Sequence, residues 1–151
     1  MSSKKKPAPA WKGTWDIAFY ATVKGEAPAL SWLRSFPVVV EKRLAAILIA
    51  VAQRPPPSFP SSSNEWRAMH TDMGGFFEAR DQHDGTDYRV FCVLDRNRHN
   101  RPTVVLVSGG EKPDGAVMKA WIYREARGFR DDYNETGRVG STPWPPPART
   151  P

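Results

Sequence analysis

The chain has 151 residues, which is enough for one domain with a substantial core but short for two. Its 22 lysines and arginines exceed its 16 acidic residues and give a net charge of +6. The excess lies at the ends: residues 1–12 contain four lysines, residues 137–151 contain two arginines, and neither segment contains an acid. Residues 13–136 therefore balance 16 bases against 16 acids, so a basic site there must come from the placement of charges.

Several classes of protein are excluded by composition. Cys92 is the single cysteine, so an internal disulfide and a cysteine-based metal cage are not possible. His70, His83 and His99 lack the spacing of metal ligands, and we expect neither a metal nor another cofactor. The N-terminal lysines are followed by no apolar segment, and the longest apolar run, residues 44–52, is too short to cross a bilayer. We expect a cytoplasmic protein without a membrane span.

The chain divides into three parts. We predict a disordered basic arm at residues 1–12, a folded domain at residues 13–136 and a disordered, proline-rich tail at residues 137–151.

The first half of the folded domain contains one strand and two helices. Residues 15–23 alternate apolar and polar side chains and predict a strand, which Gly25 ends. Prolines at 28 and 37 open two helices, because a proline near the first turn gives up an N–H that has no partner there. The second helix has one apolar face, formed by Val40, Leu44, Ile47, Leu48 and Val51. The pair predicts a helical hairpin against a sheet, followed by a proline- and serine-rich loop over residues 55–64.

The second half predicts a strand meander and a final helix. Residues 66–72, 76–81 and 87–95 are three strands, with Asp84-Gly85 as a hairpin turn, and residues 103–108 are a further β-branched run. Residues 116–135 show helical spacing before a capping glycine, Gly137. The predicted fold class is α+β, with a small, mainly antiparallel sheet, an N-terminal helical hairpin and a C-terminal helix, in the order β-α-α-β-β-β-α.

The hairpin turn sets a register that brings charges together. If Asp84 and Gly85 form its centre, Arg80 lies opposite Arg89, with Glu78 on the same face of the sheet. Like charges in such positions destabilise a sheet unless each is paired or both hold an anion. Two interpretations are open: a salt-bridge cluster with Glu78 as the counter-ion, or an anion site.

A third cation favours the anion site. Residues 108–112 read Ser-Gly-Gly-Glu-Lys, which predicts a glycine-opened turn that brings Lys112 to the same end of the sheet. Two guanidiniums and an ammonium suit a phosphate group. His83, Lys119 and Arg124 are further candidates for substrate binding, although an ordinary turn residue is the better explanation of His83, and a solvated helix face is the better explanation of Lys119 and Arg124.

These residues resemble the RelE/ParE toxin superfamily, and most of all its HigB-like, phage-derived branch. The likeness covers roughly residues 15–135 and rests on four segments: Trp66-Arg67-Ala68-Met69, Met73-Gly74-Gly75-Phe76-Phe77-Glu78-Ala79-Arg80, Tyr88-Arg89-Val90-Phe91, and Gly109-Gly110 with Lys112. It implies catalytic roles for Arg80, Arg89 and Lys112, of which Arg89 matches the arginine that contacts the scissile phosphate. The sequence departs from the pattern at Pro113, where the family has a second lysine. Tyr123 is the nearest match to an aromatic that some members use.

The resemblance also implies a function. It predicts a toxin of a type II toxin–antitoxin pair that acts as a metal-independent, RNA-binding endoribonuclease, an mRNA interferase. The expected partners are a cognate antitoxin, mRNA and the ribosome. Two alternatives stay open, because a fold does not decide its function: a gyrase-poisoning toxin of the ParE kind, and a nonenzymatic phage-derived binding module.

Overall fold

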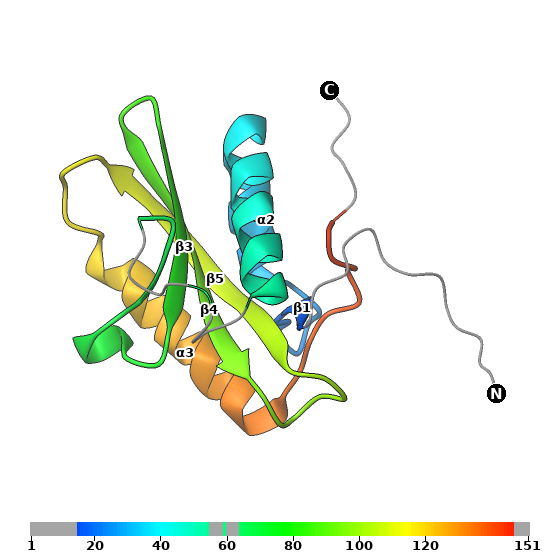
Figure 1. Cartoon of the computed structure of the whole chain (residues 1–151). Coiled ribbons are helices and arrows are strands. Elements are labelled where there is room, and N and C mark those ends of the chain that lie inside the picture. Colours follow the sequence, from blue (N-terminus) through cyan, green and yellow to red (C-terminus); the bar gives the residue numbers. More distant parts are fainter. Residues whose placement is uncertain (1–14, 55–58, 60–63, 147–151) are drawn as a thin grey trace.

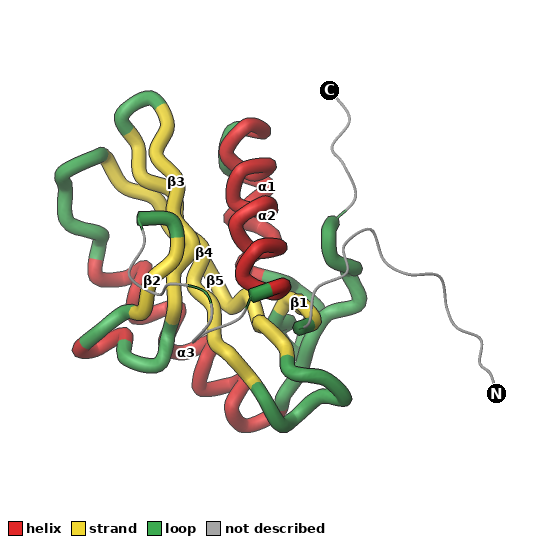
Figure 2. Tube along the Cα trace, in the orientation of Figure 1, coloured by secondary structure: helices red, strands yellow, loops and turns green. Residues whose placement is uncertain are grey.

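The computed structural model describes residues 15–54, 59 and 64–146. It contains a five-stranded sheet, which lies between helices (Figure 1). Its strand order is β1-β5-β4-β3-β2, with β1 and β5 parallel and every other neighbouring pair antiparallel. Helices α1 and α2 pack on one face, and α3 packs on the other (Figure 2). The predicted α+β class is confirmed. The predicted basic arm, most of the proline-rich loop and residues 147–151 lie outside the described part of the chain.

The elements have the following bounds. In chain order they are β1 (Asp16–Phe19), α1 (Pro28–Ser35), α2 (Val38–Gln53), β2 (Trp66–Ala68), the short 3-10 helix η1 (Thr71–Met73), β3 (Phe77–His83), β4 (Thr86–Asp95), β5 (Thr103–Pro113) and α3 (Ala120–Thr136). Four strands, not three, lie between α2 and α3, because the β-branched run at residues 103–108 begins a full strand.

The sequence prediction for the Gly109-Gly110 pair was wrong. We expected a turn, but both glycines lie inside β5. The reason is close packing on the two faces of that strand. A Cβ on Gly109 would meet Trp32 Cβ of α1 at 2.9 Å, and a Cβ on Gly110 would meet Ile122 Cγ2 of α3 at 2.7 Å. Glycine therefore lets both helices approach β5.

The β3–β4 hairpin confirms the predicted register. Asp84 and Gly85 have positive φ values of 50° and 78°, as a two-residue hairpin turn requires. Arg80 pairs with Arg89 and Glu78 pairs with Phe91. The predicted alignment of the charged side chains on one face therefore holds.

Two apolar cores cover the faces of the sheet. The core under α1 and α2 includes the whole predicted face of α2. The core under α3 includes Phe91, Val93, Met118, Ile122 and Ala126. On the α3 side, the side chains of β4 change from apolar at Phe91 to charged at Arg89 and Asp87, so a charged end adjoins the apolar core.

Residues 137–146 differ from the predicted disordered tail. Gly137 caps α3 in the left-handed conformation, as predicted, with a φ of 67°. The chain then folds back along β1: Val139 forms a bridge with Tyr20, and Trp144 packs against Phe19 with ring centroids 5.9 Å apart. Arg138 Nη1 lies 2.9 Å from Asp132 Oδ2. Apolar burial of Trp144 explains why this segment is ordered although it is rich in proline.

Among the described residues, no helix has both the length and the apolar character that a membrane span needs.

Candidate functional site

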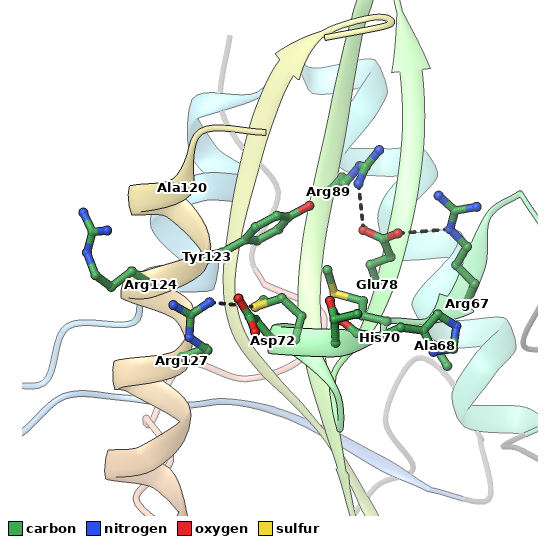
Figure 3. Close-up of a pocket in the computed structure, with 13 residues that line it drawn as sticks. Arg67, Ala68, His70, Asp72, Glu78, Arg89, Ala120, Tyr123, Arg124 and Arg127 are labelled. Atoms are coloured by element: carbon green, nitrogen blue, oxygen red, sulfur yellow. Dashed lines mark hydrogen bonds and ion pairs between the residues drawn. The ribbon is translucent and has the colours of Figure 1, made fainter. Parts of the chain in front are cut away.

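A cleft of about 670 Å³ opens between α3 and the β2–η1 segment, above the charged end of the sheet (Figure 3). The cleft is lined by Arg67, Ala68, Met69, His70, Thr71, Asp72, Met73, Glu78, Arg89, Ala120, Tyr123, Arg124 and Arg127. Four of these residues are arginines and two are acids, so the cleft carries an excess of positive charge. Such a lining favours an anionic ligand.

Glu78 lies at the floor of the cleft between two arginines from neighbouring strands. Its Oε1 accepts a hydrogen bond from Arg89 Nη1 of β4 at 3.2 Å, and its Oε2 accepts one from Arg67 Nε of β2 at 3.1 Å (Figure 3). Register explains the contact with Arg67, because Arg67 lies directly opposite Glu78 in the β2–β3 pair. The predicted counter-ion role of Glu78 is therefore present, with one arginine that the sequence reasoning did not pair with it.

Asp87 forms ion pairs with both Arg89 and Lys112. Its Oδ2 lies 2.9 Å from Lys112 Nζ and 3.5 Å from Arg89 Nη2. Burial opposes ionisation of Asp87, but hydrogen bonds from Lys112 and Gln82, together with the positive charges of Lys112 and Arg89, outweigh it and hold the pKa of this carboxyl below its usual range. Asp87 thus stays charged and links two of the three predicted cations.

Arg80 lies beside this network and does not line the cleft. It shares the face of Arg89 through the β3–β4 register, and it borders a smaller depression of about 380 Å³ at the sheet edge. Burial lowers the pKa of Arg80, and the positive charges of Arg89 and Arg67 lower it further. Within the described residues, no carboxylate lies within salt-bridge distance of it. The structure therefore joins Arg89 and Lys112 through Asp87 and leaves Arg80 as a neighbouring positive charge.

Helix α3 supplies the opposite wall of the cleft. The ring of Tyr123 packs against Phe91, with centroids 5.7 Å apart, and its hydroxyl points toward Arg89 (Figure 3). Burial raises the pKa of Tyr123, so its phenol is protonated near neutral pH. Arg127 contacts Met73 of η1 through Nη1 and Sδ, 3.9 Å apart. Arg124 is exposed at the rim of the cleft, as its predicted binding role would require.

The other two predicted binding residues lie away from the cleft lining. His83 is at the hairpin tip, where its Nε2 is 3.4 Å from Asp84 Oδ2. Lys119 is exposed just before the first turn of α3. Over the described ranges, no group of three or more histidine, cysteine or acidic side chains is arranged to hold a metal ion.

The sequence did not reveal the place of Asp87, the partner of Arg67 or the orientation of Tyr123, although Tyr123 was a candidate aromatic. Asp87 stands two residues before Arg89 in one strand, so an i, i+2 comparison would have placed both on one face. Pairing Arg67 with Glu78 requires the register of β2, which no tight turn sets. Whether Tyr123 faces the cleft depends on the rotation of α3 about its axis, which its apolar spacing defines only coarsely.

The arrangement can bind and polarise an anion. Arg89 is fixed by two carboxylates, and its fork of N–H donors matches the oxygens of a phosphate group. A protonated phenol stands on the opposite wall, and two further arginines extend the positive charge along α3. These are the groups that phosphoryl chemistry uses for charge stabilisation.

No protein-family model, curated protein or solved structure matches the chain.

Proposed function

We propose that the chain is an RNA endonuclease that acts as the toxin of a toxin–antitoxin pair. The observation that carries this proposal is the arginine-rich cleft, in which a fixed Arg89 and a protonated Tyr123 face one space. The resemblance to RelE- and HigB-like toxins, which rests on the segments that build this floor, supports the same reaction class. The implied partners are mRNA on the ribosome and a small antitoxin that covers the cleft or blocks docking to the ribosome.

The chemistry would be an internal transesterification. The 2′-oxygen of the RNA attacks the adjacent phosphorus, the bond from phosphorus to the 5′-oxygen breaks, and a 2′,3′-cyclic phosphate and a 5′-hydroxyl result. DNA lacks the attacking hydroxyl and is not a substrate. The reaction needs no metal if the protein itself stabilises the charge of the five-coordinate phosphate.

Residues of the cleft and two cations beside it would have separate roles in the reaction. Arg89 would hold the phosphate oxygens, with Lys112 and Arg80 adding positive charge from the same end of the sheet. Tyr123 would donate a proton to the departing 5′-oxygen, because its raised pKa keeps the phenol protonated. His70, exposed at the rim of the cleft, is the imidazole available to accept the proton of the 2′-hydroxyl.

Induction in growing cells tests the proposal. Arg89→Lys keeps the charge that Glu78 and Asp87 require but loses the planar fork, so we expect a loss of cleavage on the order of 100-fold. The control is Arg43→Gln. It removes an exposed arginine that lies outside the cleft, with its Nη1 3.3 Å from Asp81 Oδ2. Growth and the 5′ ends of cellular mRNA are followed for each soluble variant.

The outcomes separate the candidate functions. Growth arrest with new mRNA ends, retained in Arg43→Gln and lost in Arg89→Lys, supports the nuclease. Arrest with intact mRNA and damaged DNA would replace it with a gyrase poison. The absence of arrest in every soluble variant would reduce the cleft to a binding or structural feature.

A further inference from the structure

The floor of the cleft already contains an anion of the protein's own. Glu78 is only 3% exposed, and each of its two oxygens faces a different guanidinium. This is the arrangement in which a phosphate would lie if Arg67 and Arg89 bound it, since a phosphate also offers separate oxygens to separate arginines. A phosphate and the Glu78 carboxylate therefore compete for the same donors.

The two contacts of Glu78 differ in how easily they open. The side chain of Arg67 is 44% exposed, and an ion pair with such a partner contributes little to stability. Arg89 is buried and stays in position without Glu78, because Asp87 also contacts it and is itself held by Lys112. Exchange of Glu78 for a ligand can thus begin at Arg67 and leave Arg89 in place.

The donors and charges around Arg89 also favour an external anion. Arg89 Nε is buried, and none of the described residues accepts a hydrogen bond from it. On this face of the sheet the bases are Arg67, Arg80, Arg89 and Lys112, and the acids near them are Glu78, Asp87 and Glu65, the last beside Arg80 at the sheet edge. One positive charge is left over in a partly buried place, where charge interactions are stronger than in water.

We propose that Glu78 is a built-in competitor for the phosphate site, which lowers the affinity of the cleft for phosphate groups until a ligand displaces it from Arg67. The proposal rests on the proposed function, because it assigns the regulation of that same cleft. Loss of the Glu78 charge, with the shape of the side chain retained, strengthens phosphate binding.

Calorimetric titration with inorganic phosphate tests this inference on the purified full-length chain. Glu78→Gln keeps the volume of the side chain and removes its charge, so we expect phosphate to bind on the order of tenfold to a hundredfold more tightly than to wild type. Glu41→Gln is the matched control, since it removes the same charge from an ion pair with Arg34 (2.7 Å) between α1 and α2, on the other face of the sheet. That variant is expected to bind phosphate like wild type.

Equal or weaker phosphate binding by a folded Glu78→Gln variant overturns the proposal, and so does an equal gain in Glu41→Gln. If Glu78→Gln does not fold, Glu78→Asp takes its place, because a carboxylate shortened by one methylene cannot reach both arginines. It must then bind phosphate more tightly than wild type for the proposal to stand.

The result is independent of RNA cleavage. Tighter phosphate binding in a chain that cuts no RNA would retain the competitor and remove the nuclease. Unchanged phosphate binding in Glu78→Gln, with a wild-type chain that does cut RNA, would retain the nuclease and remove the competitor role of Glu78.

Discussion

Gly110 determines how closely α3 approaches the sheet, and with it the wall of the cleft that bears Tyr123. In a Gly110→Ala variant the new Cβ would lie 2.7 Å from Ile122 Cγ2 and 3.2 Å from Met118 Sδ. Both partners are buried in the α3 core, so neither can swing away at low cost. Overpacking of this kind costs about 1–3 kcal/mol. In a domain of this size we expect a fall in melting temperature of roughly 2–4 °C per kcal/mol.

Thermal and urea unfolding measure this effect against a matched substitution. Gly128 lies within α3, and a Cβ there meets nothing within 4 Å. Gly128→Ala should therefore gain about 1 kcal/mol from helix propensity, while Gly110→Ala loses stability. A Gly110→Ala protein as stable as wild type would refute the close packing of α3 on β5, and with it the geometry of the cleft.

Two further predictions concern groups away from the cleft. Burial opposes ionisation of Asp95, but hydrogen bonds from the Tyr133 hydroxyl (2.6 Å) and from the Asn97 and Arg98 amides lower its pKa. A lowered pKa in the folded state gives stability that is present above the unfolded value of about 4 and is lost as pH falls through the folded value. Urea unfolding should therefore show wild type more stable than Asp95→Asn at neutral pH, with a difference that shrinks below about pH 4, and a difference independent of pH would contradict the assignment. Burial raises the pKa of the Cys92 thiol, so a thiol reagent at pH 8 should leave the native chain unlabelled and label it in denaturant; rapid labelling of the native protein would show that β4 is not central.

The sequence predicts those parts of the fold that depend on short-range patterns. The turn at Asp84-Gly85 determines the β3–β4 register, so the opposition of Arg80 and Arg89 follows from counting outward. The apolar spacing of α2 likewise identifies its buried face. In both cases, residues close in the sequence contain all the information that the prediction needs.

The other features of the fold depend on contacts between residues far apart in the sequence, which local patterns do not reveal. A Gly-Gly pair is typical of a turn, and only the approach of Trp32 and Ile122 to opposite faces of β5 shows that it serves packing here. The folding back of residues 137–146 depends on the burial of Trp144 against Phe19, a contact across most of the chain. Composition alone therefore could not distinguish this segment from a disordered tail.

The candidate site was predicted in part. The sequence reasoning identified Arg89, Lys112 and Glu78 as residues at one end of the sheet, and the structure joins them in one charged network through Asp87. The cleft itself was not predicted, because it forms between α3 and η1, whose relative placement no local pattern defines.

The decisive assay is incubation of the purified chain with labelled single-stranded RNA in EDTA and, separately, with mRNA-programmed ribosomes in the magnesium buffer that intact ribosomes need. The proposed mechanism predicts products with 2′,3′-cyclic phosphate and 5′-hydroxyl ends, formed on free RNA without a metal. It also predicts no cutting where the 2′-hydroxyl at the cleavage site is replaced by hydrogen, and a loss of cutting in Arg89→Lys. Intact RNA with the folded wild-type chain in both assays, or equal cutting of the deoxy substrate, would contradict it.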